Sequence, residues 1–317
     1  METVVLVIGA NGQLGSVLVK ALQDKFGINN VIASDLRYRD GFKGQFEIID
    51  ATDFERIQEV VETHKVTQIY HLAAILSAKG EEHPLQTWDI NMKTLFNVLE
   101  VSRLNNIEKV FFPSSIAVFG DGAVKYETPN TAYLDPATVY GISKATGENW
   151  AQYYFLRYGL DVRSLRYPGV IGYQSLPGGG TTDYAVDIFH KAVLGEPFQC
   201  FLNEDATLPM IMMEDAIRAT IELMDAPKEA IKTRTSYNLA GTSFSPAEIA
   251  NEITKIYPDF KIEYAPDFRQ QIADKWPNSI DDTAAREEWG WQPEFNLEAM
   301  TKTMIKELKA YYNLIPA

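Results

Sequence analysis

The chain has 317 residues, of which 46% are hydrophobic and 23% are charged, and this composition is typical of a folded protein. Its formal net charge of −14 and pI near 4.8 argue against a general nucleic-acid or anionic-membrane binder, because such partners attract basic surfaces. One cysteine, Cys200, excludes a disulfide within the chain, and four scattered histidines lack the spacing of a zinc site, so no metal is expected. The sequence shows neither a signal-peptide pattern nor an apolar run of membrane-spanning length, which predicts a cytoplasmic protein.

Strand and helix patterns alternate along the first half of the chain. The β-branched run at residues 4–8 predicts a strand buried on both faces, and apolar residues at helical spacing follow it. Later patterns predict strands at 31–34, 46–49, 68–72 and 109–112 and helices at 53–64 and 85–104. This alternation predicts an α/β fold, a Rossmann-type doubly wound parallel sheet with right-handed crossovers.

In the second half of the chain the pattern becomes rich in loops. Strands are predicted at 161–166 and 237–240 and a helix at 184–194, and glycine- and proline-rich stretches separate them. We therefore expect a Rossmann domain over residues 1–168, which also receives segments near 210–241. Residues 169–209 and 242–317 are expected to form a smaller C-terminal substrate-binding lobe.

A glycine-rich turn joins the first strand to the first helix. Residues 9–15 have the form G-x-x-G-x-x-G, which departs by one residue from the dinucleotide fingerprint G-x-G-x-x-G. Gly9 would allow the tight turn, Gly12 the approach of a pyrophosphate, and Gly15 the packing of the helix on the strand. The helix N-terminus would face the phosphates with its N–H groups and its positive dipole end. Taken alone, the loop is also compatible with an ordinary glycine turn.

Acidic residues end the second and third strands. Asp35 lies about 20 residues past Gly15, where the fingerprint expects a carboxylate on the adenosine ribose hydroxyls. Its charge would repel a 2′-phosphate, so NAD is favoured over NADP, although Arg37 is placed to accommodate such a phosphate. Asp50 has two interpretations, an acceptor for the adenine amino group or a turn acid before the helix that begins near Asp53.

Tyr140 and Lys144 stand four positions apart, on one face of a helix predicted over residues 138–158. A phenol with its ordinary pKa of about 10 is a poor base at neutral pH. A neighbouring ammonium favours the phenolate, so the spacing predicts that Lys144 lowers the pKa of Tyr140 and also reaches the nicotinamide ribose. Ser115, at the end of a strand, would orient the reacting oxygen. The pair alone would be an ordinary surface pair, but with the glycine loop and Asp35 it predicts hydride-transfer chemistry.

These residues resemble those of the extended short-chain dehydrogenase/reductase superfamily along nearly the whole chain. The matching positions are residues 9–15, Asp35, Asp50, residues 71–74, Asn91, Ser115, Tyr140, Lys144 and the Trp-Gly-Trp-Gln-Pro of residues 289–293. The resemblance implies that Ser115, Tyr140 and Lys144 are catalytic and that Asn91, which alone would be a packing amide, supports the site. The residues expected to contact NAD are Gly9, Asn11, Gly12, Gln13, Leu14, Gly15, Asp35, Arg37, Asp50, Ala51, Leu72, Ala73, Ala74, Asn91, Tyr140, Lys144 and Tyr167.

Several activities occur in this superfamily, and the stretch from Ser115 onward helps to separate them. Dehydratases typically carry Thr-Asp-Glu there, whereas residues 115–120 are Ser-Ile-Ala-Val-Phe-Gly, without an acid, so dehydration is disfavoured. Nucleotide-sugar epimerases need only the Ser–Tyr–Lys set and a tightly held NAD. That interpretation stays open, although epimerases usually have Thr where Ala117 stands here.

A sharper resemblance is to the short-chain L-threonine 3-dehydrogenases within this superfamily. It rests on residues 113–120, 168–171, 208–210, 276–282 and, most distinctively, on Pro-Gly-Gly-Gly-Thr-Thr-Asp-Tyr-Ala at residues 177–185. The resemblance implies L-threonine as the small-molecule partner, oxidised at its 3-hydroxyl to 2-amino-3-ketobutyrate with Tyr140 as the base.

The loop at residues 177–185 suits such a substrate. Glycine N–H groups and threonine hydroxyls would hold the carboxylate, an acid such as Asp183 would face the ammonium, and Trp276 would close over the methyl group. The expected substrate contacts are Ser77, Ser115, Tyr140, Gly178, Gly180, Thr181, Thr182, Asp183 and Trp276. The loop is also compatible with a flexible segment capped by Thr182 or Asp183, and Trp276 with a packing aromatic.

The long helices 85–104 and 138–158 predict a homodimer, because members of the superfamily pair through such helices. Apolar residues of the second helix would serve either that interface or the core: Val139, Ile142, Trp150, Tyr154 and Leu156. Three functions stay open, namely threonine oxidation, nucleotide-sugar epimerisation and NAD sensing without catalysis. The intact Ser115–Tyr140–Lys144 set makes the third the weakest.

Overall fold

The computed structural model describes residues 2–178 and 180–314, and the chain divides into two compact units. The first unit comprises residues 1–115, 139–166 and 219–237. The second unit comprises residues 116–138, 167–218 and 238–317. Both units are therefore assembled from segments that are far apart in the sequence.

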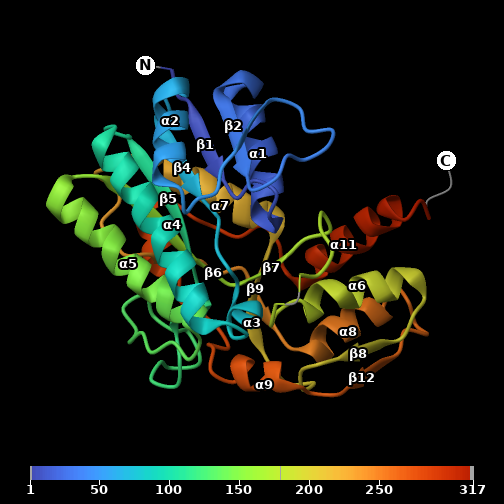
Figure 1. The fold of residues 1–317 in the computed structure, drawn as a ribbon. Coiled ribbons are helices and arrows are strands. Elements are labelled where there is room, and N and C mark those ends of the chain that lie inside the picture. The colour runs from blue at the N-terminus through green and yellow to red at the C-terminus, as the bar shows by residue number, and fades with distance from the viewer. Residues whose placement is uncertain (1, 179, 315–317) are drawn as a thin grey trace. The chain divides into compact units, whose positions relative to one another are not determined.

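A seven-stranded sheet in the order β10-β6-β5-β4-β1-β2-β3 forms the centre of the first unit (Figure 1). Its strands are β1 (Val5–Ile8), β2 (Val31–Asp35), β3 (Gln45–Ile48), β4 (Gln68–His71), β5 (Lys109–Ser115), β6 (Asp161–Tyr167) and β10 (Tyr237–Asn238). The pairs β1–β2, β2–β3, β1–β4 and β4–β5 are parallel. The predicted Rossmann-type sheet is confirmed, and its strand order reverses between β1 and β4, where ligands bind in this class of fold.

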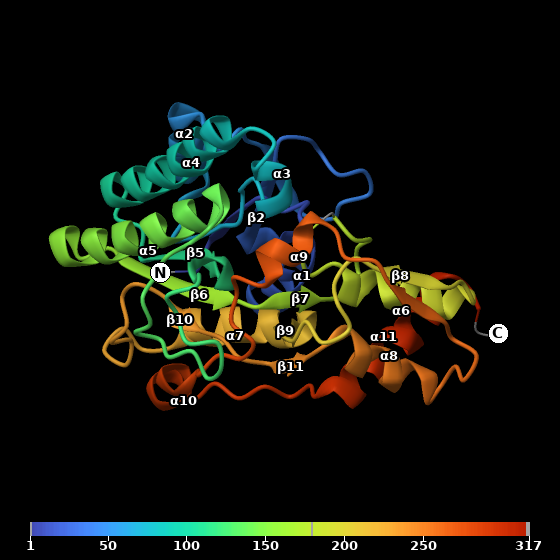
Figure 2. The same ribbon diagram turned by 90° about the horizontal axis from the view of Figure 1, so that it is seen from below.

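Helices cover both faces of this sheet. They are α1 (Gln13–Phe26), α2 (Phe54–His64), α3 (Ser77–Gly80), α4 (Pro84–Leu104), α5 (Val139–Tyr158) and the short η1 (Ile28–Asn30). Helices α2, α4 and α5 lie on one face of the sheet (Figure 2). On this face Leu6 and Ile8 of β1 and Val98 and Leu99 of α4 belong to one hydrophobic core. Each such buried side chain contributes about 1.5–3 kcal/mol. The alternating residues Val5 and Val7 face the other side, against which α1 packs.

The ends of these elements follow from local residues. Asp53 is the N-cap of α2, because its carboxylate accepts from the Arg56 N–H at 3.1 Å. Lys65 ends α2 in the left-handed conformation with φ of 54°. The predicted strands and helices of residues 4–166 therefore agree with the structure to within a few residues.

The second unit contains shorter elements. A three-stranded sheet consists of β7 (Gly169–Ile171), β9 (Leu208–Met212) and β11 (Thr242–Phe244), and a two-stranded sheet of β8 (Phe198–Cys200) and β12 (Ile262–Tyr264). The helices are η2 (Ile116–Val118), α6 (Tyr184–Leu194), α8 (Pro246–Thr254), α9 (Phe268–Ala273), α10 (Thr283–Trp289) and α11 (Leu297–Tyr311). Helices α6, α8 and α11 pack together, and α7 (Met213–Asp225) begins in this unit and ends in the first.

Candidate active site

A cavity of about 280 Å³ opens at the carboxyl ends of β1 to β4 in the first unit. Parallel strands end at one edge of a sheet, so loops that are distant in the sequence meet there. The cavity brings together the predicted residues Gly9, Gly12, Asp35, Asp50, Ala51, Leu72, Ala73 and Ala74. It also contains residues that the sequence analysis missed, although they neighbour predicted ones: Ile8, Leu36, Ile49, Ile75 and Ile90.

The glycine loop between β1 and α1 forms one wall of this cavity. Gly9 has a φ of 91°, and a Cβ there would lie 2.8 Å from the Ala73 backbone nitrogen. A Cβ at Gly15 would lie 2.2 Å from the Gly9 carbonyl oxygen, so glycine is needed for α1 to pack this closely. A Cβ at Gly12 would meet only that same oxygen, at 3.4 Å. The fold itself therefore does not demand glycine at position 12, whereas the close approach of a ligand does.

The N-terminus of α1 completes this wall. No side chain caps the helix at its N-cap residue, Gly12. Uncapped N–H groups and the positive end of the helix dipole favour an anion. The loop therefore fits the pyrophosphate of a dinucleotide, with Asn11, Gln13 and Leu14 supplying neighbouring backbone.

Asp35 lies at the end of β2 and lines the cavity. Its two carboxylate oxygens accept from the N–H groups of Asn11, at 2.9 Å, and Leu36, at 2.8 Å. Each oxygen keeps a further lone pair for a ribose hydroxyl. Arg37 is exposed, its carbonyl oxygen accepts from the Asn11 side chain, and it is not among the residues that line the cavity. The lining thus offers a carboxylate and no cation for a 2′-phosphate, which fits NAD.

Asp50 combines both interpretations of its position. One carboxylate oxygen accepts from the N–H and the hydroxyl of Thr52, at 2.9 and 2.8 Å, so Asp50 closes a turn before α2. These hydrogen bonds lower the pKa of Asp50. The residue also lines the cavity, where its other oxygen remains available. The carbonyl of the neighbouring Ala51 is held by the Asn97 side chain at 3.0 Å.

Asn91 of α4 supports the cavity without lining it. Its side chain accepts from the N–H of Ile75 at 2.8 Å and donates to the carbonyl of Ile75 at 3.0 Å. It also donates to the hydroxyl of Ser143 on α5 at 3.4 Å. Asn91 therefore fixes the loop that follows Leu72, Ala73 and Ala74.

Ser115, Tyr140 and Lys144 come together in the first unit. Ser115 is the last residue of β5, and its hydroxyl is hydrogen-bonded to that of Tyr140 in the first turn of α5. Lys144 is 5% exposed. Its Nζ lies 5.4 Å from the ring centroid of Tyr140 and 4.6 Å from that of Phe112. The residues predicted to act together are therefore neighbours, and Phe112 is an additional one.

The predicted direction of the Tyr140 pKa is wrong. Burial raises the pKa of Tyr140 to about 12, and the hydrogen bond with Ser115 offsets this only in part. Burial also lowers the pKa of Lys144 to about 7, because a desolvated ammonium is costly. The spacing in the sequence correctly places the two groups on one helix face. It does not tell how far both are removed from water, and here desolvation outweighs their attraction.

His71, the last residue of β4, is a buried titratable group that sequence reasoning left without a role. Burial and the charge of Lys144 lower the pKa of His71 to about 3, so its imidazole is neutral at physiological pH. Within the described part of the chain its Nδ1 has no hydrogen-bond partner.

The glycine-rich loop of the second unit precedes α6, which spans the predicted residues 184–194. Gly179 lies outside the described residues. The Gly180 N–H donates to Asp183 at 2.8 Å, which differs from the expectation that this N–H holds a substrate carboxylate. Thr181 is buried, and among the residues that the structure describes its hydroxyl has no hydrogen-bond partner. Thr181 is therefore the group of this loop with the clearest unmet capacity to bind a ligand.

The other predicted contacts have varied surroundings. Ser77 begins α3 and is buried, and Tyr167 ends β6 and is buried. Gly178 is exposed, whereas Thr182 is partly buried. The sequence indicates Ser77 and Tyr167 as ligand contacts only through their positions close to the ends of strands.

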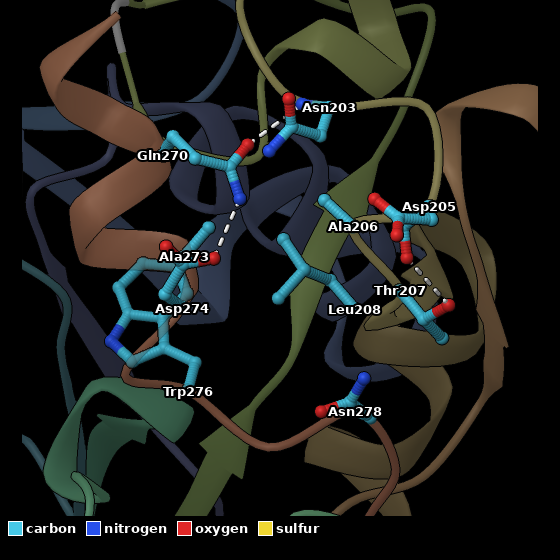
Figure 3. A pocket seen from close by; sticks show the side chains of 10 residues that line it. All are labelled: Asn203, Asp205, Ala206, Thr207, Leu208, Gln270, Ala273, Asp274, Trp276 and Asn278. Atoms are coloured by element: carbon cyan, nitrogen blue, oxygen red, sulfur yellow. Dashed lines mark hydrogen bonds between the residues drawn. The ribbon is translucent and has the colours of Figure 1, made fainter. Parts of the chain in front are cut away.

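Trp276 lines a second cavity, of about 300 Å³, within the second unit (Figure 3). Its indole is 7% exposed. Gln270 organises one wall, since it accepts from the Asn203 N–H at 2.7 Å and donates to Asp274 at 2.6 Å. The remaining lining residues are Asp205, Ala206, Thr207, Leu208, Ala273 and Asn278. This wall is polar and acidic around one aromatic ring.

Among residues 2–178 and 180–314, no group of three or more His, Cys, Asp or Glu side chains is arranged to hold a metal ion. No helix in this part of the chain combines the length and the apolar character that crossing a bilayer requires.

Known proteins resemble the chain over almost its whole length. An uncharacterized epimerase/dehydratase of Staphylococcus aureus is 43% identical over 310 residues, 96% of each chain. Among solved structures, a partial consensus L-threonine 3-dehydrogenase is 53% identical, with a TM-score of 0.95 over 97% of this chain and 99% of the other. The holo form of a GalE-like L-threonine dehydrogenase from Cupriavidus necator is 52% identical, with a TM-score of 0.95 over 96% and 100%.

A third solved structure is described as a monomeric L-threonine 3-dehydrogenase from a metagenome; it is 47% identical, with a TM-score of 0.94 over 97% and 99% of the two chains. The profile of the NAD dependent epimerase/dehydratase family matches residues 5–240. This match covers the glycine loop, Asp35 and the Ser115–Tyr140–Lys144 set, and NAD is accordingly the cofactor. The chain belongs to the NAD dependent epimerase/dehydratase family.

Proposed function

We propose that this chain is an NAD-dependent L-threonine 3-dehydrogenase, which oxidises the 3-hydroxyl of L-threonine to 2-amino-3-ketobutyrate. The observation that carries the proposal is the hydrogen-bonded Ser115–Tyr140 pair beside the buried Lys144, at the carboxyl edge of the sheet that also bears the cofactor cavity. L-threonine dehydrogenases with 47–53% identity over 96–97% of this chain support the choice of substrate.

The proposed reaction uses all three catalytic residues. When bound, NAD supplies a nicotinamide ring that accepts a hydride. Ser115 orients the 3-hydroxyl, and Tyr140 takes its proton as the C3–H bond breaks with its electron pair. A pKa of about 12 makes the phenolate scarce at neutral pH, so Tyr140 passes its own proton to Lys144 in the same step. Lys144, with a pKa of about 7, is neutral often enough near neutrality to accept that proton.

The second unit is proposed to hold the amino-acid part of the substrate. The unpartnered hydroxyl of Thr181 supports a contact with the carboxylate, together with Gly178 and Thr182. Asp183, whose carboxylate accepts from the Gly180 N–H, is proposed to face the ammonium with its negative charge. Trp276 is proposed to cover the substrate methyl group, and Ser77 to add a polar contact.

A nucleotide-sugar epimerase is the alternative, because epimerases share this family and the same catalytic set. Binding a diphosphate favours cationic side chains. The cavity around Trp276 is lined by Asp205 and Asp274 and by neither lysine nor arginine among its described lining residues. This supports an ammonium-bearing substrate over a nucleotide sugar.

Absorbance at 340 nm tests the proposal directly. Purified protein with NAD should form NADH when L-threonine is added and not when D-threonine is added. Tyr140→Phe should lower kcat by about 10²–10⁴-fold with NADH binding retained, because the phenol acts in proton transfer. Interconversion of UDP-glucose and UDP-galactose without net NADH would establish the alternative, and near-normal threonine oxidation by Tyr140→Phe would refute the assignment of the base.

Three further proposals, on domain roles, oligomeric state and cellular setting, accompany this function. We propose that residues 1–168 with the segments near 210–241 act as the NAD-binding domain, and that residues 169–209 and 242–317 act as the substrate lobe. We also propose a homodimer, although one relative is described as monomeric. The setting would be threonine catabolism in the cytoplasm, which fractionation of expressing cells would check.

A further inference from the structure

A buried ion pair lies next to the proposed catalytic residues, one turn of α5 beyond Lys144. Glu148 of α5 is 0% exposed and Arg166 of β6 is 3% exposed. Arg166 donates twice to the Glu148 carboxylate, from Nε at 2.9 Å and from a terminal nitrogen at 2.7 Å. The hydroxyl of Ser114 donates to the same carboxylate at 2.5 Å. Glu148 therefore joins helix α5 to two neighbouring strands.

Glu148 shares a helix face with the catalytic residues. Tyr140, Lys144 and Glu148 follow each other at intervals of four, so they stand one above another on successive turns of α5. Ser114, which binds Glu148, is followed directly by Ser115, which binds Tyr140. Helix α5 and strand β5 are thus joined twice, by the contact of Glu148 with Ser114 and by that of Tyr140 with Ser115.

Helix α5 also packs unusually closely on strand β5 next to Glu148. A Cβ on Gly147 would lie 2.5 Å from Cζ of Phe112 and 3.1 Å from Cδ2 of Leu95. Phe112 in turn lies beneath the ammonium of Lys144. The Phe112 ring therefore lies directly against Gly147, and glycine is needed for this close packing. The neighbouring Glu148 adds a directional contact to it.

General energetics argue against stability as the reason for this pair. Desolvating two charges can cost as much as their attraction returns, and apolar residues of similar volume often stabilise a core equally well. A bidentate pair does fix geometry, because both hydrogen bonds must align together. What the pair provides here is therefore the position of α5 along the sheet.

We infer that Glu148, clamped by Arg166 and Ser114, is a positioning residue. It fixes where Tyr140 and Lys144 lie relative to Ser115 along the axis of α5. The inference rests on the proposed function, because it concerns the proton transfer of that same site. Glu148 touches neither substrate nor cofactor in this scheme. It acts through the Tyr140–Ser115 hydrogen bond.

Graded substitutions at Glu148 test the inference. Glu148→Gln keeps the length and one acceptor oxygen, whereas Glu148→Ala removes the whole clamp. We expect kcat for threonine oxidation to fall about 10-fold in the first and on the order of 100-fold in the second, since misplacement by about 1 Å has effects of this size. KM for NAD should change less than kcat, because most of the cofactor cavity is built from the ends of other strands and only Tyr140 and Lys144 of the expected NAD contacts lie on α5.

A second buried pair on the same strand gives the matched control. Asp161, 3% exposed, accepts from Arg163 and Arg234 near the start of β6. It lies five residues from Arg166, about 16 Å along the strand. Asp161→Asn and Asp161→Ala should lower the melting temperature at least as much as the Glu148 variants, because two arginines lose their partner. Their kcat should nevertheless stay within about twofold of the wild type.

Two results would overturn the inference. One is an unchanged kcat in Glu148→Ala, and the other is an equal loss of kcat in the Asp161 variants at matched stability. A crystal structure of Glu148→Ala gives a readout that needs no substrate, since the Tyr140–Ser115 hydrogen bond should be broken in it and an intact bond would refute the inference. If Glu148→Ala does not fold, Arg166→Lys keeps the charge and removes the bidentate geometry. Absence of threonine oxidation by the wild type would refute the proposed function while leaving the crystallographic test in force.

Discussion

Lys144 is the residue whose environment most constrains the chemistry. It is buried against Phe112 and Tyr140, and desolvation brings its pKa to about 7. A cationic group whose charged form is disfavoured by burial loses its proton at a lower pH than it does in water. Lys144 is therefore an ammonium below about pH 7 and a neutral amine above it. In the proposed proton relay only the neutral amine can receive the proton of Tyr140.

Activity should consequently rise with pH through a midpoint near 7. The quantity to measure is kcat/KM for NAD at saturating threonine, which reports groups of the enzyme before the cofactor binds. Lys144→Arg keeps a cation whose pKa lies above about 12 and which therefore never becomes neutral. We expect this variant to lose the midpoint near 7 and to lower kcat by about 10²-fold or more.

The control for this prediction is Lys109, which is also partly buried, with its pKa lowered by burial, and which donates to the Met224 carbonyl far from the site. Lys109→Arg should keep the wild-type midpoint. A midpoint near 7 that persists in Lys144→Arg would assign the titration to another group and would leave Lys144 with an electrostatic role alone.

For single residues, the sequence predicted which side chains react but not the direction in which the pKa of Tyr140 shifts. The spacing of Tyr140 and Lys144 and the strand end at Ser115 predicted neighbours that the structure brings together. The direction of the Tyr140 pKa was wrong, because the burial that raises it depends on how distant segments pack. The clamp at Glu148 was missed for the same reason, since no local pattern relates it to Arg166.

Two glycines of the loop between β1 and α1 have different expected roles, which experiment can distinguish. A Cβ at Gly15 would collide with the Gly9 carbonyl at 2.2 Å, whereas a Cβ at Gly12 would meet it only at 3.4 Å. Gly15→Ala should therefore destabilise the protein by about 1–3 kcal/mol, as overpacking does. Gly12→Ala should change stability by less than about 0.5 kcal/mol but weaken NAD binding about 10-fold or more, because the new methyl group occupies the approach of the pyrophosphate.

Chemical denaturation and titration of NADH fluorescence measure these two effects independently. Gly27 serves as a check on conformation, because its φ is 90° and a Cβ there would meet nothing within 4 Å. Gly27→Ala should lower stability through backbone strain and leave NADH affinity unchanged. Equal losses of NADH affinity in Gly12→Ala and Gly27→Ala would remove Gly12 from the cofactor site.

Element prediction was most successful where the pattern was long. The helix at 184–194 was predicted to the residue, and the helix at 85–104 to within one residue, because each repeats an apolar period several times. The three-residue strands β7, β8, β11 and β12 were missed, and so was the five-residue β9 in the stretch around Pro209 that was expected to be loop. A run of three residues does not establish a period, and these strands form only because partners elsewhere in the second unit pair with them.

The whole first unit explains why distant residues form one site. The strand order reverses between β1 and β4, so the loops after β1, β2, β3 and β4 and the end of β5 lie along one edge of the sheet. Alternating strand and helix patterns predict such a sheet, and the edge then follows from the rule for parallel strands. The fold and the cofactor site were therefore accessible from sequence. The composition of the second unit's cavity was not, because it depends on contacts of the β8–β9 loop with α9 and the segment that follows it.

The surface of α4 and α5 in the first unit bears on assembly. Two of the five apolar residues considered for an interface belong to the core instead, since Tyr154 is 5% exposed and Trp150 packs against the hydrophobic cluster. Leu156 and Ile142 are 73% and 43% exposed, and Tyr153 beside them is also exposed. Exposed apolar side chains that recur along one long helix are what a helix-pairing interface requires.

We therefore expect the protein to sediment as a homodimer of twice the 35.7 kDa chain, and the double variant Ile142→Glu/Leu156→Glu to sediment as a monomer. Buried carboxylates without partners would be too costly at such an interface. Ile48→Glu is the matched control, because Ile48 is 58% exposed on the edge strand β3, away from both helices, and this variant should remain a dimer. The monomeric variant should keep NADH binding, since the cofactor cavity lies within one chain. A wild type that sediments as a monomer at micromolar concentration, like the relative described as monomeric, would refute the homodimer and leave the exposed face of α5 without a role in assembly.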